Sequence, residues 1–376
     1  YPASLEAAGK ALGLPQEKQK LSTGKALIRY FCTPCKPTKT NGGRRWNLPK
    51  HDMEKWDLFK EYNGQDVVTE HEILRRLKPF PLPEEEWDLW RMDARRNGFG
   101  VRVDTELVEG ALIVDGISTQ NLTEEAIQLT GLSNPNSTSQ LLSWLEEKGT
   151  RLPNLQKATV SEVLEGEELL PDVRRVLEIR QQLGKTSIKK YVAMETAKCE
   201  DDRIRGLTQF YGANRTGRWA GRLVQMQNLP RNYMNTLDEA RRLVKQKNYT
   251  GIRLLYGNVP DTLSQLIRTA FIPSEGHKFV VADFSAIEAR VIAWLAGEEW
   301  VNEVFATHGK IYEATAAQMF HVPIEKIAKG NPEYSLRQKG KVATLALGYQ
   351  GGTAALIAMG ALAIGLAEEE LPDIVA

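Results

Sequence analysis

A short apolar run that ends in a carboxylate constrains the fold of this chain more than any other segment. Residues 279–282, Phe-Val-Val-Ala, include two β-branched side chains, and Asp283 follows them directly. Such a run predicts a buried β-strand. Ser285 then opens a segment that predicts a helix through Trp294. An aspartate between a strand and a helix is either a rigidly held ligand for Mg²⁺ or a cap on the following helix, and this segment alone leaves both open.

A second segment carries cations at helical spacing. Four residues recur at every fourth position, namely Arg337, Lys341, Leu345 and Tyr349. Because four residues turn an α-helix by about 400°, these side chains line one slowly drifting stripe. Two cations one turn apart repel each other unless an anion lies over them, and a triphosphate is such an anion. An exposed basic helix face that includes Lys339 is the alternative, but it does not explain why an aromatic residue ends the stripe.

Charge is unevenly distributed along the chain. Lys and Arg number 49 and Asp and Glu number 48, so the total charge says nothing about a polyanionic partner. Residues 203–232, however, contain six arginines and no acidic residue. A run of one sign in a balanced protein predicts either a phosphate-binding strip or a solvated basic face. The six are Arg203, Arg205, Arg215, Arg218, Arg222 and Arg231.

Length and composition limit the class of protein. A chain of 376 residues, 42% of them hydrophobic, predicts two or three domains with real cores. Three cysteines argue against a disulfide framework and fit a reducing cytoplasm. No apolar run reaches the roughly 20 residues that a membrane span needs. The N-terminus is not a signal peptide and lacks an initiating Met, so we expect the chain to be a piece of a longer protein.

Hydrophobic periodicity predicts a mainly helical chain with few strands. The expected strands are residues 206–210, 224–228 and 278–282. The expected helices are residues 51–78, most of 84–200, 285–294 and most of 297–376. Within the second of these regions, residues 140–148 follow an Asn-Pro turn as one helix, and residues 174–198 form a long helix or a helix pair.

Together, these motifs resemble those of the DNA polymerase I family (family A), and more so its phage-type members. The family's first catalytic motif, D-Y-S-x-I-E-x-R, matches the segment from Asp283 to Arg290. Its fingers-helix motif, R-x-x-x-K-x-x-x-F/Y-x-x-x-Y-G, matches the stripe that begins at Arg337. Its T-G-R and Q-N-x-P motif matches residues 216–218 and 227–230. The three motifs follow the family's order, and a weaker resemblance extends over nearly the whole chain.

The resemblance implies an α+β, mainly helical fold with the right-hand architecture of a polymerase. A thumb, a partial palm and fingers would follow the C-terminal remnant of a 3′–5′ exonuclease domain of the RNase H-like type. The implied domains are residues 1–83 for the exonuclease remnant and linker, 84–202 for the helical thumb, 203–296 for the first half of the palm and 297–376 for the fingers. The second half of the palm is missing from this assignment.

The implied activity is template-directed DNA synthesis, the Mg²⁺-dependent transfer of a deoxynucleotide from a dNTP to a primer 3′-hydroxyl. Asp283 would be the catalytic metal ligand, and it would bind both ions of a two-metal site whose second carboxylate lies outside this chain. Arg337 and Lys341 would hold the outer phosphates of the nucleotide. Lys341 would also be the catalytic proton donor to the leaving pyrophosphate, because arginine does not titrate usefully.

Three further side chains would shape the nucleotide site. Glu288 would fill the space of a ribose 2′-hydroxyl, and Tyr349 would stack at the templating position. Leu345 would pack against the sugar where the family commonly has Phe or Tyr, which puts the handling of analogues without a 3′-hydroxyl in doubt. Lys310-Ile-Tyr312 stands where many members have Asp-Ile-His, so a phosphate-contacting His is absent and Tyr312 is its candidate substitute.

The implied partners are primer-template DNA and dNTPs, without a membrane. DNA would lie along residues 203–232, which we call the arginine-rich region, and along the helical thumb. The DNA-binding residues so implied are Arg218, Arg222, Gln227, Asn228, Arg290, Lys185 and Lys189. Tyr62 and Asp66 match the last exonuclease motif, Y-x-x-x-D, as a vestigial or split remnant. A processivity factor, or a second chain with the missing ends, is a further candidate partner, and the implied location is the cytoplasm of a bacterial host or phage-infected cell.

Two departures from the family leave other interpretations open. The His-Asp-Glu motif that supplies the second metal carboxylate is not found, and neither are the earlier exonuclease motifs, so we expect both sites to be incomplete. A single-subunit phage-type RNA polymerase shares the aspartate and the cationic helix, but Glu288 argues against it because such an enzyme must leave room for the 2′-hydroxyl. A non-catalytic DNA-binding fragment is the other alternative, although it needs neither Asp283 nor Lys341.

Overall fold

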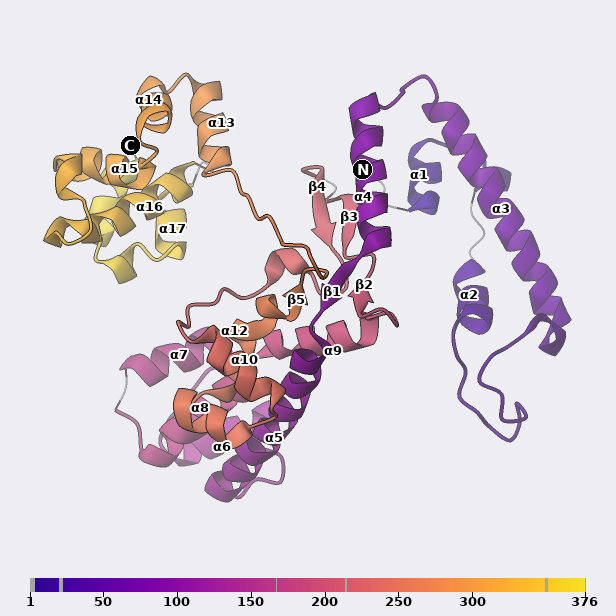
Figure 1. Cartoon of the computed structure of the whole chain (residues 1–376), viewed down its shortest axis with the longest axis horizontal. Coiled ribbons are helices and arrows are strands. Elements are labelled where there is room, and N and C mark those ends of the chain that lie inside the picture. The colour runs from indigo at the N-terminus through magenta and orange to yellow at the C-terminus, as the bar shows by residue number, and fades with distance from the viewer. Residues whose placement is uncertain (1–3, 20–22, 167, 214, 349–350, 376) are drawn as a thin grey trace. The chain divides into compact units, whose positions relative to one another are not determined.

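The chain folds into two compact units, Tyr1–Lys278 and Phe279–Ala376. The structure, a computed structural model, describes residues 4–19, 23–166, 168–213, 215–348 and 351–375 (Figure 1). Within these ranges, no helix combines the length and the apolar character that crossing a membrane requires.

The first unit begins with two short helices against a long one. Helices α1 (Leu5–Ala11) and α2 (Gly24–Cys32) pack against α3 (Met53–Leu77). The Asp52 carboxylate caps α3 by accepting a hydrogen bond of 3.0 Å from the backbone N–H of Lys55. The helix predicted for residues 51–78 is therefore confirmed, with its start fixed by a side-chain cap.

A helical body follows, as predicted for most of residues 84–200. Helix α4 (Glu84–Phe99) precedes α5 (Thr105–Thr130), which Asp104 caps through the backbone N–H of Leu107 at 3.1 Å. The remaining helices of this body are α6 (Thr138–Glu147), α7 (Lys157–Gly166), α8 (Pro171–Leu183) and α9 (Lys189–Ala197). Helices α8 and α9 are the pair that the sequence predicted between residues 174 and 198.

A small antiparallel sheet crosses the unit, because three short strands from distant parts of the chain meet. Strand β1 (Val101–Val103) lies between β2 (Arg203–Ile204) and β5 (Phe271–Ile272). In this register Val101 pairs with Ile204, and Val103 pairs with Phe271. The sheet therefore ties the start of α5 to the first residues of the arginine-rich region, residues 203–232, and to a later segment at Phe271.

The arginine-rich region forms a hairpin of β3 (Thr208–Ala213) and β4 (Arg218–Gly221). The strand predicted at residues 206–210 is confirmed in position, although it begins two residues later. The strand predicted at residues 224–228 is wrong, since Met226–Asn228 is a turn of 3-10 helix. The reason is local, because Leu223 and Gln225 have φ of 53° and 54°, in the left-handed region that a strand cannot use.

Three helices that the sequence did not predict complete the core of the first unit. They are α10 (Leu237–Lys245), α11 (Tyr249–Tyr256) and α12 (Val259–Leu266). Helix α10 contacts α5, and the Asp104 carboxylate pairs with both Arg241 and Lys245 at 2.7 Å. The N-terminal cap of α5 therefore also anchors α10.

In the part of the second unit that the structure describes, helices follow one another from Ile287 onward, which confirms the prediction that most of residues 297–376 are helical. Its helices are α13 (Ile287–Ala296), α14 (Glu299–Thr307), α15 (Ile311–Phe320), α16 (Leu336–Leu347), α17 (Thr353–Ala358) and α18 (Leu371–Val375). Helices α15 and α16 pack very closely at Gly340. A Cβ atom at this position would be 2.2 Å from the carbonyl oxygen of Tyr312, so only glycine fits without a shift of the backbone.

The buried strand predicted at residues 278–282 is wrong. This segment has no regular secondary structure, and Val280 and Val281 are 83% and 90% exposed. Its β-branched composition favours a strand, but a strand is stable only when a neighbour pairs with its backbone groups, and no described strand does so. The helix predicted after Asp283 is confirmed as α13, which begins at Ile287.

Candidate functional site

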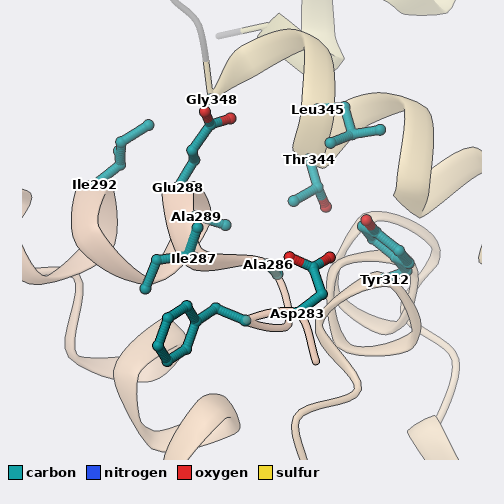
Figure 2. A pocket seen from close by; sticks show the side chains of 11 residues that line it. Asp283, Ala286, Ile287, Glu288, Ala289, Ile292, Tyr312, Thr344, Leu345 and Gly348 are labelled. Carbon is teal, nitrogen blue, oxygen red and sulfur yellow. The ribbon is translucent and has the colours of Figure 1, made fainter. Parts of the chain in front are cut away.

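A cavity of about 210 Å³ lies in the second unit, between residues 283–292 and α16 (Figure 2). Its walls are mainly apolar, and Asp283 and Glu288 contribute its two carboxylates. In Figure 2 the side chains of Asp283, Tyr312 and Thr344 point toward one another, and the carboxylate of Glu288 points toward Gly348. The lining residues are Asp283, Phe284, Ala286, Ile287, Glu288, Ala289, Ile292, Tyr312, Thr344, Leu345 and Gly348. We call this space the apolar cavity.

A second cavity, of about 240 Å³, shares two wall residues with the first. Ala286 and Tyr312 line both spaces, so the two cavities are neighbours. Lys310, Glu313 and Arg337 give the second cavity its charges. The complete lining is Ser285, Ala286, Gly309, Lys310, Ile311, Tyr312, Glu313 and Arg337. We call this space the charged cavity.

Arg337 has an anionic partner within the chain. Its Nε donates to Oε1 of Glu313 at 2.8 Å, and its guanidinium lies 5.3 Å from the ring centroid of Tyr312. Only 15% of the Glu313 side chain is exposed, against 33% for Arg337. Glu313 was not predicted from the sequence, because the ion pair joins two helices and hydrophobic periodicity within one helix does not show such a contact.

The close packing of α15 on α16 positions these side chains. Gly340 lets the two helix backbones meet, and Thr344 Oγ1 contacts Thr315 Oγ1 at 3.0 Å and the carbonyl oxygen of Gly340 at 2.8 Å. Tyr312 and Glu313 on α15 therefore lie beside Arg337 on α16. The geometry of the charged cavity follows from this one helix pair.

Of the predicted stripe Arg337, Lys341, Leu345 and Tyr349, only part lines the two cavities. Arg337 lines the charged cavity, and Leu345 lines the apolar cavity. Lys341 is half-buried and lines neither of them, and it makes no hydrogen bond or ion pair with any described residue. Tyr349 lies outside the described residues. The roles assigned to these side chains remain predictions.

Asp283 lies at an exposed position on the apolar cavity. Its carboxylate makes no hydrogen bond or ion pair with a residue that the structure describes, so it does not act as a helix cap. Among the described residues, no group of three or more His, Cys, Asp or Glu side chains could hold a metal ion by itself. Asp283 therefore offers one free oxygen ligand, which fits Mg²⁺ because this ion keeps waters and phosphate oxygens in its other positions.

Arg290 stabilises the turn that precedes α13. Its Nε donates to the carbonyl oxygen of Ser285 at 2.9 Å, and its guanidinium lies 4.3 Å from the ring centroid of Phe305. The adjoining Ala286 has φ of 49°, a left-handed conformation that is costly for a residue with a side chain. Arg290 thus helps to hold a strained residue that lines both cavities. Its predicted contact with DNA remains a prediction.

In the first unit, a buried carboxylate fastens the β3–β4 hairpin to α4. Asp93 is 6% exposed and accepts hydrogen bonds from Thr208 Oγ1 at 2.6 Å and from Trp219 Nε1 at 2.9 Å, one on each strand. Arg96 adds an ion pair at 2.7 Å. Burial raises the pKa of Asp93, but these hydrogen bonds outweigh it and hold the pKa below its ordinary value. Asp93 was not predicted from the sequence.

Two arginines of the arginine-rich region bind other groups of the protein itself. Arg205 pairs with Asp201 at 2.7 Å, and Arg203 donates to the carbonyl oxygen of Gly100. Four of the predicted DNA-binding residues remain exposed around the hairpin, namely Arg218, Arg222, Gln227 and Asn228. Exposed arginines beside a fixed hairpin are consistent with a phosphate-binding surface.

The predicted thumb lysines differ in their surroundings. Lys185 pairs with Asp261, which also accepts a hydrogen bond from the hydroxyl of Tyr233 at 2.7 Å, so its charge is already neutralised. Lys189 is exposed. An anionic partner would therefore have to compete with Asp261 for Lys185, whereas Lys189 is exposed, and the predicted DNA contacts of both lysines remain predictions.

Tyr62 is a core residue of the N-terminal helices. It is 4% exposed, its ring stacks on that of Phe59, and a Cβ on Gly24 would be 1.9 Å from it. Asp66, one turn further along α3, is half-buried. Packing explains the position of Tyr62, and the exonuclease interpretation of Tyr62 and Asp66 remains a prediction.

Comparison with known proteins identifies the family. The family model described as DNA polymerase family A matches residues 116–364. A DNA polymerase of Bacillus phage SP02 is 60% identical over 374 residues, which cover 100% of this chain and 57% of that protein. A thermostable DNA polymerase I of Thermus thermophilus is 30% identical over 323 residues, covering 80% of this chain and 34% of that protein.

The fold agrees with the same family. A solved structure titled as the POL domain of Pol1 from M. smegmatis, in complex with DNA primer-template and dNTP, aligns with a TM-score of 0.57 at 19% identity. The alignment covers 99% of this chain and 57% of that one. The chain thus spans a little over half the length of its phage relative. These matches confirm the predicted resemblance and the mainly helical polymerase fold: the chain belongs to DNA polymerase family A.

Proposed function

We propose that the chain is the part of a template-directed DNA polymerase that binds the incoming deoxynucleotide. The observation that carries this proposal is the pair of neighbouring cavities, one of which has Asp283 on its wall. An apolar cavity beside a charged one suits a nucleotide, because its base and sugar can make apolar contacts with the protein while its triphosphate is anionic. Membership of DNA polymerase family A supports the same substrate.

The apolar cavity would hold the sugar and base. Leu345 and Ile287 offer apolar contact, and Glu288 on the first turn of α13 would occupy the space that a 2′-hydroxyl needs. A site that fills this space with a carboxylate rejects ribonucleotides, because the extra hydroxyl would have to displace a charged group. This supports a deoxynucleotide substrate over the RNA polymerase alternative.

The charged cavity would hold the outer phosphates. Glu313 binds the Nε of Arg337, which leaves the two terminal nitrogens of the guanidinium for phosphate oxygens. Lys341, four residues later, has no partner among the described residues and is therefore available to give a proton to the leaving pyrophosphate.

Asp283 would hold Mg²⁺ together with the phosphates. When bound, the ion would activate the primer hydroxyl and neutralise charge on the phosphates. The chain's own contribution is the exposed carboxylate of Asp283, which makes no hydrogen bond or ion pair with a described residue. The second protein ligand would come from sequence that its longer relatives possess.

Primer-template DNA is the partner that we propose for the β3–β4 hairpin and the residues after it. Arg218 and Arg222 would contact phosphates, and Gln227 and Asn228 would read the minor-groove acceptors that all base pairs share. The SP02 relative belongs to a Bacillus phage, so we place the activity in the cytoplasm of an infected bacterial cell.

Equilibrium binding of a fluorescent dATP in the presence of Mg²⁺ tests the nucleotide site directly. We expect the Asp283→Ala and Arg337→Ala variants of the 376-residue chain to bind it at least about fivefold more weakly than the parent. Asp373→Ala, which removes an exposed carboxylate of the same unit away from both cavities, is the matched control. Unchanged binding by both site variants would refute the nucleotide site.

A further inference from the structure

The charged cavity contains one cation that nothing in the described structure neutralises. Arg337 is paired with Glu313, so together these two side chains carry no net charge. Lys310, the residue immediately before α15, also lines the cavity. Its side chain is exposed and makes no hydrogen bond or ion pair with any described residue. The net positive charge of this cavity therefore comes from Lys310.

We propose that Lys310 is a second phosphate-binding side chain, which contacts an outer phosphate of the nucleotide beside Arg337. This inference rests on the proposed function of the two cavities. A strongly anionic group gains little net Coulomb energy from a neutral Arg–Glu pair, although the arginine still supplies directional hydrogen bonds. A lysine on the same wall adds the missing charge, and its ammonium can follow the phosphates because its stem is flexible.

The position of Lys310 limits which part of the nucleotide it reaches. It lines the charged cavity and is absent from the walls of the apolar cavity. Tyr312, two residues later, lines both cavities and therefore lies where the two spaces adjoin. Lys310 therefore belongs to the phosphate end of the site, and its effect on binding has to depend on the number of phosphates.

Equilibrium titrations with fluorescent dATP and, by competition, with unlabelled dATP and dAMP test this inference on the 376-residue chain. We expect Lys310→Ala to weaken dATP binding about three- to tenfold in the presence of Mg²⁺, and to change dAMP binding less than about twofold. Lys310→Arg should keep dATP binding within about twofold, because it preserves the positive charge. Inorganic tripolyphosphate should displace fluorescent dATP less well from the Lys310→Ala variant than from the parent.

Lys329→Ala is the matched control. Lys329 is an exposed lysine of the same unit that lines neither cavity and makes no side-chain hydrogen bond or ion pair with a described residue. If Lys310→Ala binds dATP as the Lys329→Ala control does, while Arg337→Ala weakens it, the role of Lys310 is refuted and the nucleotide site stands. An equal loss for dATP and dAMP also refutes it. If Asp283→Ala and Arg337→Ala both bind as the parent does, the proposed function itself fails.

Discussion

Glu313 illustrates how one partly buried side chain sets the orientation of another. Its carboxylate holds the Nε of Arg337 at 2.8 Å, and therefore fixes the direction of the guanidinium before any nucleotide arrives. The same carboxylate lies on the wall of the cavity that we assign to phosphates, where its negative charge opposes binding. Orientation and repulsion thus act in opposite directions at this residue.

Replacing Glu313 by Gln separates these two effects. The amide oxygen can still accept the hydrogen bond from Arg337, while the negative charge is lost. We expect Glu313→Gln to bind Mg²⁺–dATP about two- to fivefold more tightly, because a partly buried negative charge no longer repels the phosphates. The measurement is the dissociation constant at constant ionic strength, and Glu325→Gln, an exposed position outside both cavities, is the control. Weaker binding by Glu313→Gln would show that the ion pair itself is needed to orient the arginine.

At the scale of elements, contacts across the chain decide what local sequence leaves open. The helix at residues 51–78 was predictable because its periodicity and its Asp52 cap lie in one segment. The strand predicted at residues 278–282 is absent, because a strand needs a neighbour that the composition of the segment cannot specify. For the same reason Asp93 and Glu313 could not be found, since their partners lie 115 and 24 residues away.

The resemblance to family A gave more of the candidate site than periodicity did. The apolar run had marked Asp283 and helical spacing had marked Leu345, and the resemblance added Glu288 and gave all three side chains their roles; the structure brings them to one cavity. Periodicity indicated that Arg337, Lys341 and Leu345 share one face of a helix, but only Arg337 and Leu345 line the two cavities. Sequence spacing fixes the face of a helix, whereas the neighbouring helix determines which turns of that face are covered.

Asp93 anchors the β3–β4 hairpin, and its removal should affect DNA binding without affecting the nucleotide site. Asp93→Asn replaces an oxygen that accepts hydrogen bonds by an amide donor, so we expect unfolding of the first unit to become easier by about 1–3 kcal/mol. We also expect weaker binding of primer-template DNA, because the hairpin carries Arg218. Chemical denaturation and a DNA-binding titration are the measurements. Asp88→Asn, on the exposed face of α4, is the control.

The pH dependence of stability provides a second check on Asp93. Its folded pKa is lowered, so its ionisation stabilises the native state fully above the ordinary pKa of 3.8, and this contribution is lost as the pH falls through the lowered folded value. The difference in unfolding free energy between the parent and Asp93→Asn should therefore shrink at acidic pH. A difference that grows on acidification would contradict the assignment.

Gly340 determines the spacing of α15 and α16, and with it the charged cavity. A Cβ atom there would be 2.2 Å from the carbonyl oxygen of Tyr312 and 2.8 Å from the backbone nitrogen of Ala316, so Gly340→Ala has to push the helices apart. We expect a loss of at least about 2 kcal/mol in the stability of the second unit, measured by thermal or chemical unfolding. Gly64→Ala in α3 meets open space and should be neutral or slightly stabilising. Equal effects of the two substitutions would contradict this account.

At the scale of the whole molecule, the chain has two compact units, and our proposal gives each a separate task. We assign nucleotide binding to the second unit and propose DNA contacts for the hairpin of the first. The SP02 relative contains a further stretch of sequence, since this chain covers 57% of its length. Asp283 is the only carboxylate that the cavities offer as a metal ligand on our assignment, because Glu288 is given to the sugar and Glu313 to Arg337.

We therefore expect the 376-residue chain to bind Mg²⁺–dATP but to extend a primer poorly by itself. A two-metal site needs a second carboxylate, which these cavities do not provide. A primer-extension assay with a labelled primer-template and all four dNTPs measures this, and a full-length relative such as the SP02 polymerase is the positive control. Robust incorporation by the chain alone would refute the expectation.

The exposed segment at residues 279–284 has a consequence for the behaviour of the chain in solution. Phe279, Val280, Val281 and Phe284 are each more than half exposed, and the backbone between them is unpaired with any described strand. An apolar, β-prone stretch with free backbone groups, in which Asp283 is the one charged residue, is a template for association between molecules. The colloidal stability of the purified chain should therefore be governed by this stretch, so that a single Val281→Lys change raises the concentration at which it remains monomeric.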